Sequence, residues 1–225
     1  MEQNTINRHS MIYISDDAKK KIYETLSNNL EGDSLRLAKE IFKDNPKIPG
    51  FVRRDEPKLD HVAIGFVHYC RINDNRLRLG TYVHKKDIIK VMSPYELLQR
   101  KAYSLNLSLE CMKVLAGLTD MADLYDLKIG VFGSAALELA TDLPYVDEAS
   151  DVDLLIKVAP YERLLDFYRC AKENFKGINL DFEVELPNGY GVKLAEIFME
   201  TKTVLGKSLN DVRLLERSEV MQYLR

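Results

Sequence analysis

Two short stretches decide the fold of this chain: Val131-Phe132-Gly133-Ser134 and, after an intervening segment, Ser150-Asp151-Val152-Asp153-Leu154-Leu155-Ile156. Residues i and i+2 of a strand face the same side, so Asp151 and Asp153 point the same way where an apolar strand begins. Two neighbouring carboxylates repel each other unless a positive charge lies between them. Because only oxygen donors lie nearby in the sequence, the pair predicts a site for Mg²⁺ or Mn²⁺.

The turn at Gly133 and Ser134 closes one predicted strand and opens a helix. The free N–H groups at a helix N-terminus bind anions, and glycine lets a phosphate approach the backbone closely. Ordinary strand–helix turns have the same sequence, so the turn is informative only beside the two carboxylates. A phosphate turn next to a divalent-metal site is typical of phosphoryl transfer.

A third acidic stretch, Leu180-Asp181-Phe182-Glu183-Val184-Glu185, places its carboxylates on one face and its apolar side chains on the other. An edge strand with one solvated face would show the same alternation. The functional interpretation is a further carboxylate beside Asp151 and Asp153, which could hold metal or accept a hydroxyl proton.

The surrounding periodicity alternates between strand and helix. It predicts strands at 128–132, 152–158 and 178–186, helices at 134–141, 161–175 and 192–200, and a short strand and a final helix in the last 20 residues. This order predicts a mixed sheet flanked by helices, in an α+β fold.

The N-terminal part has a different pattern. Helices are predicted at 16–30 and from 33 to about 43, and an antiparallel β module over about 51–92 with a turn at 73–75. Ser93, Pro94 and Glu96 then have the spacing of a helix capping box, and helical periodicity continues to about residue 124. We therefore expect a small α/β substrate- or carrier-binding module at 1–92 and a catalytic domain at 93–225.

Composition and charge narrow the class of protein. With 225 residues and 46% hydrophobic side chains, the chain is long and apolar enough to bury a core without disulfides. Its net charge of −3 combines +4 in residues 1–91 with −7 in residues 92–225. All four histidines lie in the first part, so a metal in the acidic part is expected to have oxygen ligands only. Among these histidines, His9 is expected to be a surface residue rather than a catalytic one. This distribution disfavours nonspecific nucleic-acid binding.

Three further features concern cofactors and location. The three cysteines form no CxxC or Cys/His cluster, so neither a zinc site nor a disulfide framework is indicated. The N-terminus lacks the pattern of a signal peptide, and no apolar run has the ~18 residues of a membrane span. We expect a soluble cytoplasmic protein without a membrane partner.

The pattern Gly-Ser, Asp-x-Asp and a later strand carboxylate resembles the nucleotidyltransferase superfamily of DNA polymerase beta. The interval between Ser134 and Asp151 is longer than is usual in that superfamily. It contains the segment Thr141-Asp142-Leu143-Pro144-Tyr145-Val146, which narrows the resemblance to one family. The chain is similar to the phosphoribosyl-dephospho-CoA transferase of malonate decarboxylase, the holo-acyl-carrier-protein synthase of that system. The resemblance is specific over about 130–217 and looser over 1–92, where Arg8-His9 and Phe51-Val52-Arg53-Arg54 contribute.

This resemblance implies a reaction. The donor would be 2′-(5″-triphosphoribosyl)-3′-dephospho-CoA, and a serine of the malonate decarboxylase acyl carrier protein would attack its α-phosphorus and release diphosphate. Asp151, Asp153 and Asp181 would hold Mg²⁺, and Asp181 would also take the serine proton, with Glu183 as the alternative. The Gly133-Ser134 backbone would hold the outer phosphates.

Basic residues are the remaining candidates. Lys207, Arg53 and Arg54 would contact phosphate, because the planar fork of arginine matches phosphate oxygens. Two other functions stay open at this point: a citrate lyase-type or other small-acceptor transferase, and a non-catalytic domain that binds a nucleotide or a partner. The sequence leaves undetermined the oligomeric state, the number of metal ions and the docking surface of the carrier protein.

Overall fold

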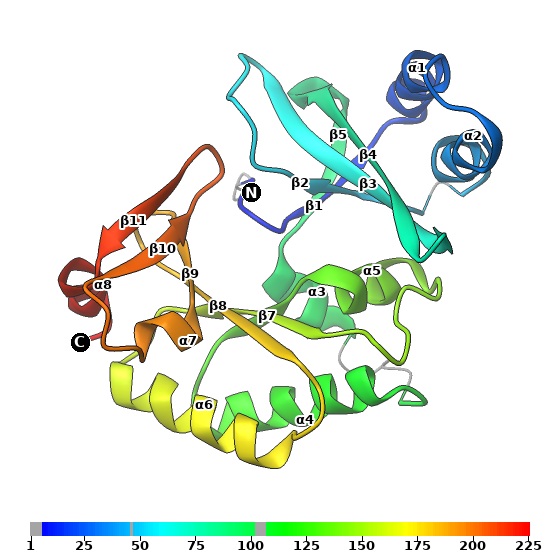
Figure 1. Ribbon diagram of the computed structural model, residues 1–225. Helices are drawn as coiled ribbons and strands as arrows, with labels where there is room; N and C mark the ends of the chain where they lie inside the picture. The colour runs from blue at the N-terminus through cyan, green and yellow to red at the C-terminus, as the bar shows by residue number, and fades with distance from the viewer. Residues whose placement is uncertain (1–5, 46, 102–106) are drawn as a thin grey trace.

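The computed structural model describes residues 6–45, 47–101 and 107–225, which form two β-sheets with helices around each (Figure 1). Helices and mixed sheets are combined in one chain, so the predicted α+β class is confirmed. None of the helices in the described ranges has the length and apolar character that crossing a membrane requires.

The first sheet is antiparallel and has the strand order β4-β3-β2-β1-β5. Its strands are β1 (Met11–Ile14), β2 (Gly50–Val52), β3 (His61–Ile72), β4 (Asn75–His84) and β5 (Ile88–Met92). Its helical segments are α1 (Asp16–Ser27), α2 (Gly32–Lys39), the π-helical turn η1 (Glu40–Asp44) and the 3₁₀ turn η2 (Lys85–Asp87). Ser15 caps α1 by accepting a hydrogen bond from the backbone N–H of Ala18.

The second sheet is mixed and has the order β11-β10-β9-β8-β7-β6, with β7 and β8 parallel. Its strands are β6 (Ile129–Val131), β7 (Val152–Lys157), β8 (Leu180–Glu185), β9 (Gly191–Lys193), β10 (Thr203–Lys207) and β11 (Val212–Glu216). The helices of this part are α3 (Pro94–Lys101), α4 (Glu110–Leu124), α5 (Gly133–Thr141), α6 (Tyr161–Asn174), α7 (Leu194–Ile197) and α8 (Arg217–Tyr223).

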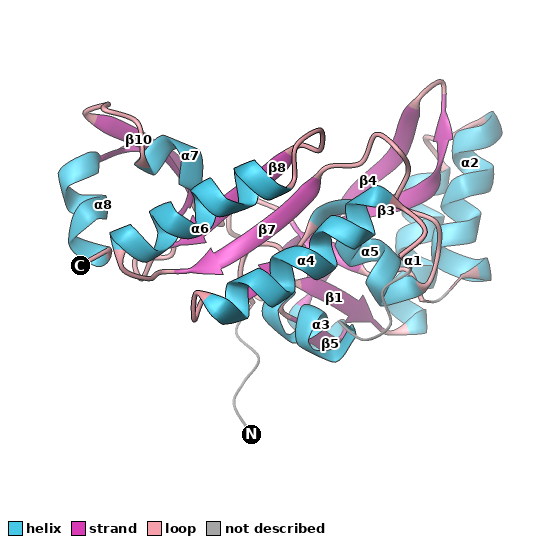
Figure 2. Cartoon of the chain, turned by 90° about the horizontal axis from the view of Figure 1, so that it is seen from below, coloured by secondary structure: helices cyan, strands magenta, loops and turns pink. Residues whose placement is uncertain are grey.

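Helices α4 and α6 lie side by side over one face of β7 and β8 (Figure 2). The alternating apolar residues of these strands, such as Leu154, Phe182 and Val184, are buried in the core on that side. The opposite face is therefore left for the charged residues of the same strands. The acidic residues of β7 and β8 that the sequence analysis named therefore all lie on one surface of the sheet.

The two parts of the chain share a core. Met11 and Met92 of the first sheet belong to the same buried cluster as α4, α5 and β7. Tyr145, in the segment between α5 and β7, is fully buried, and its hydroxyl donates to the carbonyl of Val67 on β3 at 2.8 Å. The 141–146 segment that sets this chain apart is thus a structural link between the two sheets.

Several sequence expectations require correction. The predicted helix at 192–200 is strand β9 followed by the single-turn helix α7, and the C-terminal segment adds a β10–β11 hairpin before α8. Strand β1 was not expected at all. These strands have three to five residues, too few for a periodicity to separate strand from helix. The predicted helix 16–30 ends at Ser27, where Asn28 forms the cap.

Candidate active site

The three predicted aspartates lie on the exposed face of the second sheet. Asp151 directly precedes β7, Asp153 is its second residue, and Asp181 on β8 is the register partner of Asp153. Residues paired in this way in neighbouring strands have side chains on the same face. The structure therefore brings together three carboxylates from two segments of the chain.

Asp153 has the most perturbed environment of the three. Burial, followed by the negative charges of Asp181, Asp151 and Glu183, raises its pKa to about 7 against the opposing charge of Lys193. Gly133, with φ +68°, leaves space for this carboxylate, because a Cβ at that position would clash with Asp153 Oδ2. A partly buried carboxylate with too little positive charge around it is suited to bind a cation.

The carboxylate oxygens of this site can supply a part, but not the whole, of a Mg²⁺ coordination shell. No group of three His, Cys, Asp or Glu side chains within the described ranges converges into a complete metal cage. Asp181 Oδ2 instead accepts a hydrogen bond from Lys193 Nζ at 3.0 Å. Protein Mg²⁺ sites often use one or two carboxylates and complete their shell with water and substrate phosphates. Asp151 and Asp153 fit that arrangement.

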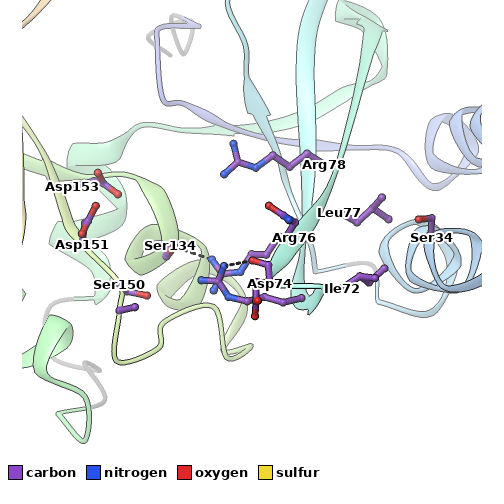
Figure 3. Close-up of a pocket in the computed structure, with 13 residues that line it drawn as sticks. Ser34, Ile72, Asp74, Arg76, Leu77, Arg78, Ser134, Ser150, Asp151 and Asp153 are labelled. Carbon is purple, nitrogen blue, oxygen red and sulfur yellow. Dashed lines mark hydrogen bonds between the residues drawn. The ribbon is translucent and has the colours of Figure 1, made fainter.

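A cleft of about 930 Å³ opens beside this pair (Figure 3). Asp151, Asp153, Ser134 and Ser150 line one side. Three arginines that flank the β3–β4 turn line the other side: Arg71, Arg76 and Arg78. The guanidinium of Arg78 extends across the opening toward the aspartates (Figure 3), and it makes no hydrogen bond or ion pair with another side chain among the described residues. The cleft thus places acidic and basic walls opposite each other.

Arg76 lies against the start of α5. Its Nη1 donates to Ser134 Oγ at 2.9 Å, its Nη2 donates to the carbonyl of Tyr145, and only 11% of its side chain is exposed. Its Nε is buried and has no hydrogen-bond partner in the part of the chain that the structure describes. Burial and the nearby Arg71 lower the pKa of Arg76. A guanidinium next to the positive end of a helix dipole produces a local excess of positive charge, which favours an anion there.

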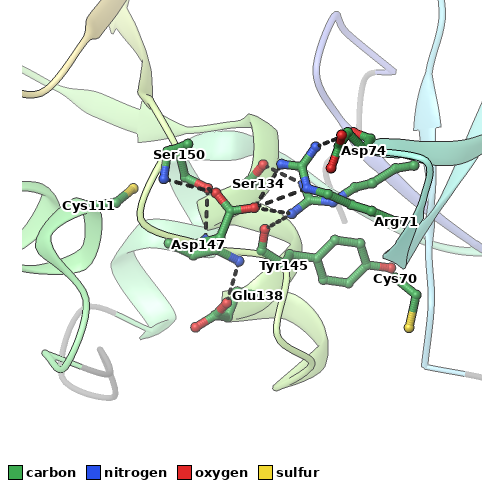
Figure 4. Close-up of polar contacts among 12 residues, drawn as sticks. Cys70, Arg71, Asp74, Cys111, Ser134, Glu138, Tyr145, Asp147 and Ser150 are labelled. Atoms are coloured by element: carbon green, nitrogen blue, oxygen red, sulfur yellow. Dashed lines mark hydrogen bonds and ion pairs between the residues drawn. The ribbon is translucent and has the colours of Figure 1, made fainter.

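Arg71 and Asp147 connect the cleft to the segment between α5 and β7 (Figure 4). Arg71 Nη2 lies 2.7 Å from Asp147 Oδ2, and Arg76 Nη2 lies 3.5 Å from the same atom. Asp147 also accepts a hydrogen bond from the Ser150 hydroxyl at 2.9 Å. The loop that leads into Asp151 is therefore held by arginines from the other sheet.

Glu183, the alternative third carboxylate, is already surrounded by basic side chains. Its Oε2 lies 2.9 Å from Arg8 Nη2 and 3.2 Å from His9 Nε2, and its Oε1 lies 3.8 Å from Lys207 Nζ. Burial alone would raise the pKa of Glu183, but the hydrogen bond from His9 and the charges of Arg8, His9 and Lys207 together lower it to about 2. Glu183 is thus an anchor for the N-terminal segment.

The predicted phosphate-binding cations lie elsewhere. Lys207 pairs with Glu183, while Arg53 lies against Gly65 and Gly80 with its Nη2 3.5 Å from Asp55. Arg54 is exposed. Among the described residues none of the three lines the cleft, because β2 places Arg53 and Arg54 away from the β3–β4 turn. Their contact with phosphate stays a prediction, and this geometry favours other arginines.

His9 is a correction to the sequence analysis. Its side chain is 20% exposed, its ring stacks on Phe132 at 4.0 Å, and it contacts Glu183. His9 is thus packed between the N-terminal segment and the second sheet, beside the anchor Glu183 and outside the lining of the cleft. The cleft arginines were also missed, although Arg76 and Arg78 alternate on one face directly after the 73–75 turn.

Comparison with known proteins identifies the family. Residues 96–218 match the family described as phosphoribosyl-dephospho-CoA transferase MdcG, C-terminal domain. A curated phosphoribosyl-dephospho-CoA transferase of Pseudomonas putida is 30% identical over 194 residues, which cover 84% of this chain and 87% of that protein. The chain belongs to the phosphoribosyl-dephospho-CoA transferase family.

A second relative from this transferase family supports the assignment. The phosphoribosyl-dephospho-CoA transferase of Xanthomonas euvesicatoria pv. vesicatoria (strain 85-10) is 31% identical over 148 residues, or 65% of this chain and 68% of that protein. No solved structure matches the chain significantly. Membership in this family confirms the prediction that the chain is an enzyme, a transferase, rather than a non-catalytic binding domain.

Proposed function

We propose that this transferase attaches the phosphoribosyl-dephospho-CoA group to a serine of the malonate decarboxylase acyl carrier protein. The donor is 2′-(5″-triphosphoribosyl)-3′-dephospho-CoA. The observation that carries the proposal is the cleft in which Asp151 and Asp153 face Arg71, Arg76 and Arg78. A metal-bound triphosphate needs two kinds of protein partner: carboxylates that bind its metal ion, and arginines that bind its phosphate oxygens.

Asp151 and Asp153 would hold Mg²⁺, or Mn²⁺ in its place, together with phosphate oxygens of the donor. When bound, the metal neutralises charge on the triphosphate and orients it. Asp181 is the third candidate ligand if its bond to Lys193 opens. The raised pKa of Asp153 supports this assignment, because a carboxylate that lacks a counter-charge in the protein gains most from a bound cation.

The arginine wall would receive the leaving group. The serine oxygen forms a bond to the α-phosphorus, and the bond from that phosphorus to the oxygen bridging the β-phosphate breaks. Arg76, beside Ser134 and the N-terminus of α5, and Arg78 would bind the departing diphosphate. The backbone of Gly133 and Ser134 would assist, since its N–H groups open α5.

Asp181 is the better candidate for the base that takes the serine proton. It is the register partner of Asp153 and is 29% exposed, so an acceptor can reach it. Glu183 is only 6% exposed, pairs with Arg8 and Lys207 and contacts His9, which makes its protonation costly. The proton would therefore pass to the Asp181 carboxylate while Glu183 stays ionised.

The test uses the full chain with Mg²⁺, the donor and purified carrier proteins. We expect diphosphate release and a mass gain of one phosphoribosyl-dephospho-CoA group on the malonate decarboxylase carrier. A carrier with its acceptor serine replaced by alanine should gain no mass. Faster modification of the citrate lyase carrier would reassign the acceptor, and absence of transfer to any carrier would overturn the proposal.

A further inference from the structure

A second cavity, of about 430 Å³, lies on the same face of the second sheet as the cleft. Its lining includes Leu155, two residues after Asp153, and Glu185, two residues after Glu183. Two strand residues span about 7 Å. The cavity thus begins close to the candidate catalytic carboxylates, and its volume is in the range of ~300–1,000 Å³ typical of small-molecule sites.

The second cavity differs from the cleft in charge. Arg8 is the one basic residue among its described lining residues, and Glu183 already pairs with it at 2.9 Å. Two carboxylates are present: Glu185, 2.6 Å from Lys157, and Asp211, which accepts a hydrogen bond from the Tyr190 hydroxyl at 2.9 Å. A phosphate would gain little here, so the cavity suits an uncharged part of a ligand.

Amide side chains provide its specific polar groups. Asn7, Asn188 and Asn210 line the cavity, and across the described ranges none of their side-chain amide nitrogens donates a hydrogen bond to the protein. Asn188 Oδ1 accepts one from the backbone N–H of Tyr190 at 3.2 Å, which orients that side chain. An asparagine amide matches the paired donor and acceptor on the edge of an adenine ring.

The walls of the cavity are also preformed. The Tyr190 ring is held by its bond to Asp211 and by the Arg213 guanidinium, 4.7 Å from the ring centre. The β10–β11 turn is closed by hydrogen bonds between Ser208 and Asp211 at 2.8 and 3.0 Å. Apolar surface from Leu155 and Leu209 completes the lining. A rigid pocket with apolar walls and a few polar groups is typical of a nucleoside site.

We propose that the second cavity binds the adenosine of the donor while the arginine-lined cleft holds its triphosphate. This inference rests on the proposed function, because that donor joins an adenosine to a triphosphate through one ribosyl group. Asp153 and Leu155 are neighbours on the same face of β7. Asp153 would then lie beneath the triphosphate side of that ribosyl group, and Leu155 beneath its adenosine side. Arg8, held by Glu183 between them, marks the boundary.

The test blocks each site separately and uses 3′-dephospho-CoA and inorganic diphosphate with Mg²⁺ as probes in calorimetry. Asn210→Trp fills the second cavity, and Leu214→Trp adds the same indole to an exposed position on the same hairpin, outside the cavity. We expect Asn210→Trp to weaken 3′-dephospho-CoA binding at least tenfold and to leave diphosphate binding unchanged. Leu214→Trp should alter neither.

Two further measurements sharpen the assignment. Adenosine should displace 3′-dephospho-CoA, and pantetheine should not. The reverse result would overturn the assignment of the second cavity to adenosine. Equal 3′-dephospho-CoA affinity in Asn210→Trp and the unmodified chain, or its displacement by inorganic diphosphate, would also overturn it. If the probe binds in the cavity but no carrier is modified, this inference stands and the proposed acceptor fails.

Discussion

Asp153 on β7 and Glu183 on β8 lie on the same face of one sheet, yet their surroundings differ in charge. Arg8, His9 and Lys207 surround Glu183, and its pKa falls to about 2. Asp153 has mainly carboxylates beside it, and its pKa rises to about 7. The protein itself thus supplies the counter-charge for one carboxylate and leaves the other short of positive charge.

In the proposed function, this difference separates a structural carboxylate from a metal-binding one. A group that is neutralised within the fold contributes to stability, whereas a group left short of positive charge reduces the stability of the ligand-free protein and gains from binding. Substitutions at the two positions should therefore affect different measured quantities.

The largest effect is expected from the aspartate pair. Asp151→Asn or Asp153→Asn should reduce the rate of carrier modification by about 10³-fold or more, because the metal-binding charge is lost. Transfer is measured as diphosphate release, and circular dichroism checks that the fold is retained. Glu148→Gln, an exposed position in the same loop, is the matched control. Full activity in either aspartate variant would refute the metal assignment.

The next effect concerns stability at the second carboxylate. Glu183→Gln leaves Arg8 and Lys207 without their buried counter-charge and should lower the free energy of unfolding by about 3 kcal/mol in urea denaturation. Glu185→Gln, two residues along the strand, should cost less than about 1 kcal/mol, because its charged partner Lys157 is 42% exposed and a glutamine oxygen can still accept the hydrogen bond from the Tyr95 hydroxyl. Equal midpoints for the two variants would show that Glu183 is no anchor.

The pH dependence of the two carboxylates should have opposite signs. The folded chain keeps the Asp153 proton up to about pH 7, whereas the unfolded chain releases it near 3.8, so this group destabilises the metal-free protein as pH rises from about 4 to 7. Asp153→Asn should therefore be more stable than the unmodified chain at pH 8, by up to about 4 kcal/mol, with little difference near pH 4. Unfolding curves with chelator test this; parallel pH profiles would contradict it.

Glu183 should act in the other direction. Its folded pKa of about 2 lies below the ordinary 4.5, so its contribution is present above pH 4.5 and is lost as the pH falls toward 2. The stability difference between the unmodified chain and Glu183→Gln should shrink over that range.

The smallest effect is expected at the arginine wall. Arg78→Ala should raise the KM for the donor about tenfold, since one exposed phosphate contact is lost, and should leave the thermal midpoint unchanged. Arg54→Ala removes the same charge from an exposed position that does not line the cleft. If Arg54→Ala raises KM and Arg78→Ala does not, the sequence-based choice of arginine was the better one.

The sequence predicted local features well. Strand β7, helix α5 and the shared face of Asp151 and Asp153 follow from alternation and from a glycine turn, which depend on neighbouring residues only. Short strands such as β1 and β9 did not follow, because three or four residues carry too little periodicity. His9 was misjudged because its partner, Glu183, is 174 positions away.

What the sequence alone determined was an acidic pair at the start of a strand, a glycine turn before it and the family resemblance they carry. The tertiary structure decided which charges meet that pair. Arg76 reaches Ser134 across 58 positions, and Arg8 and His9 reach Glu183 from the other end of the chain. Local spacing sets which residues share a face, but only the packing of the two sheets against a common core selects the cations opposite them.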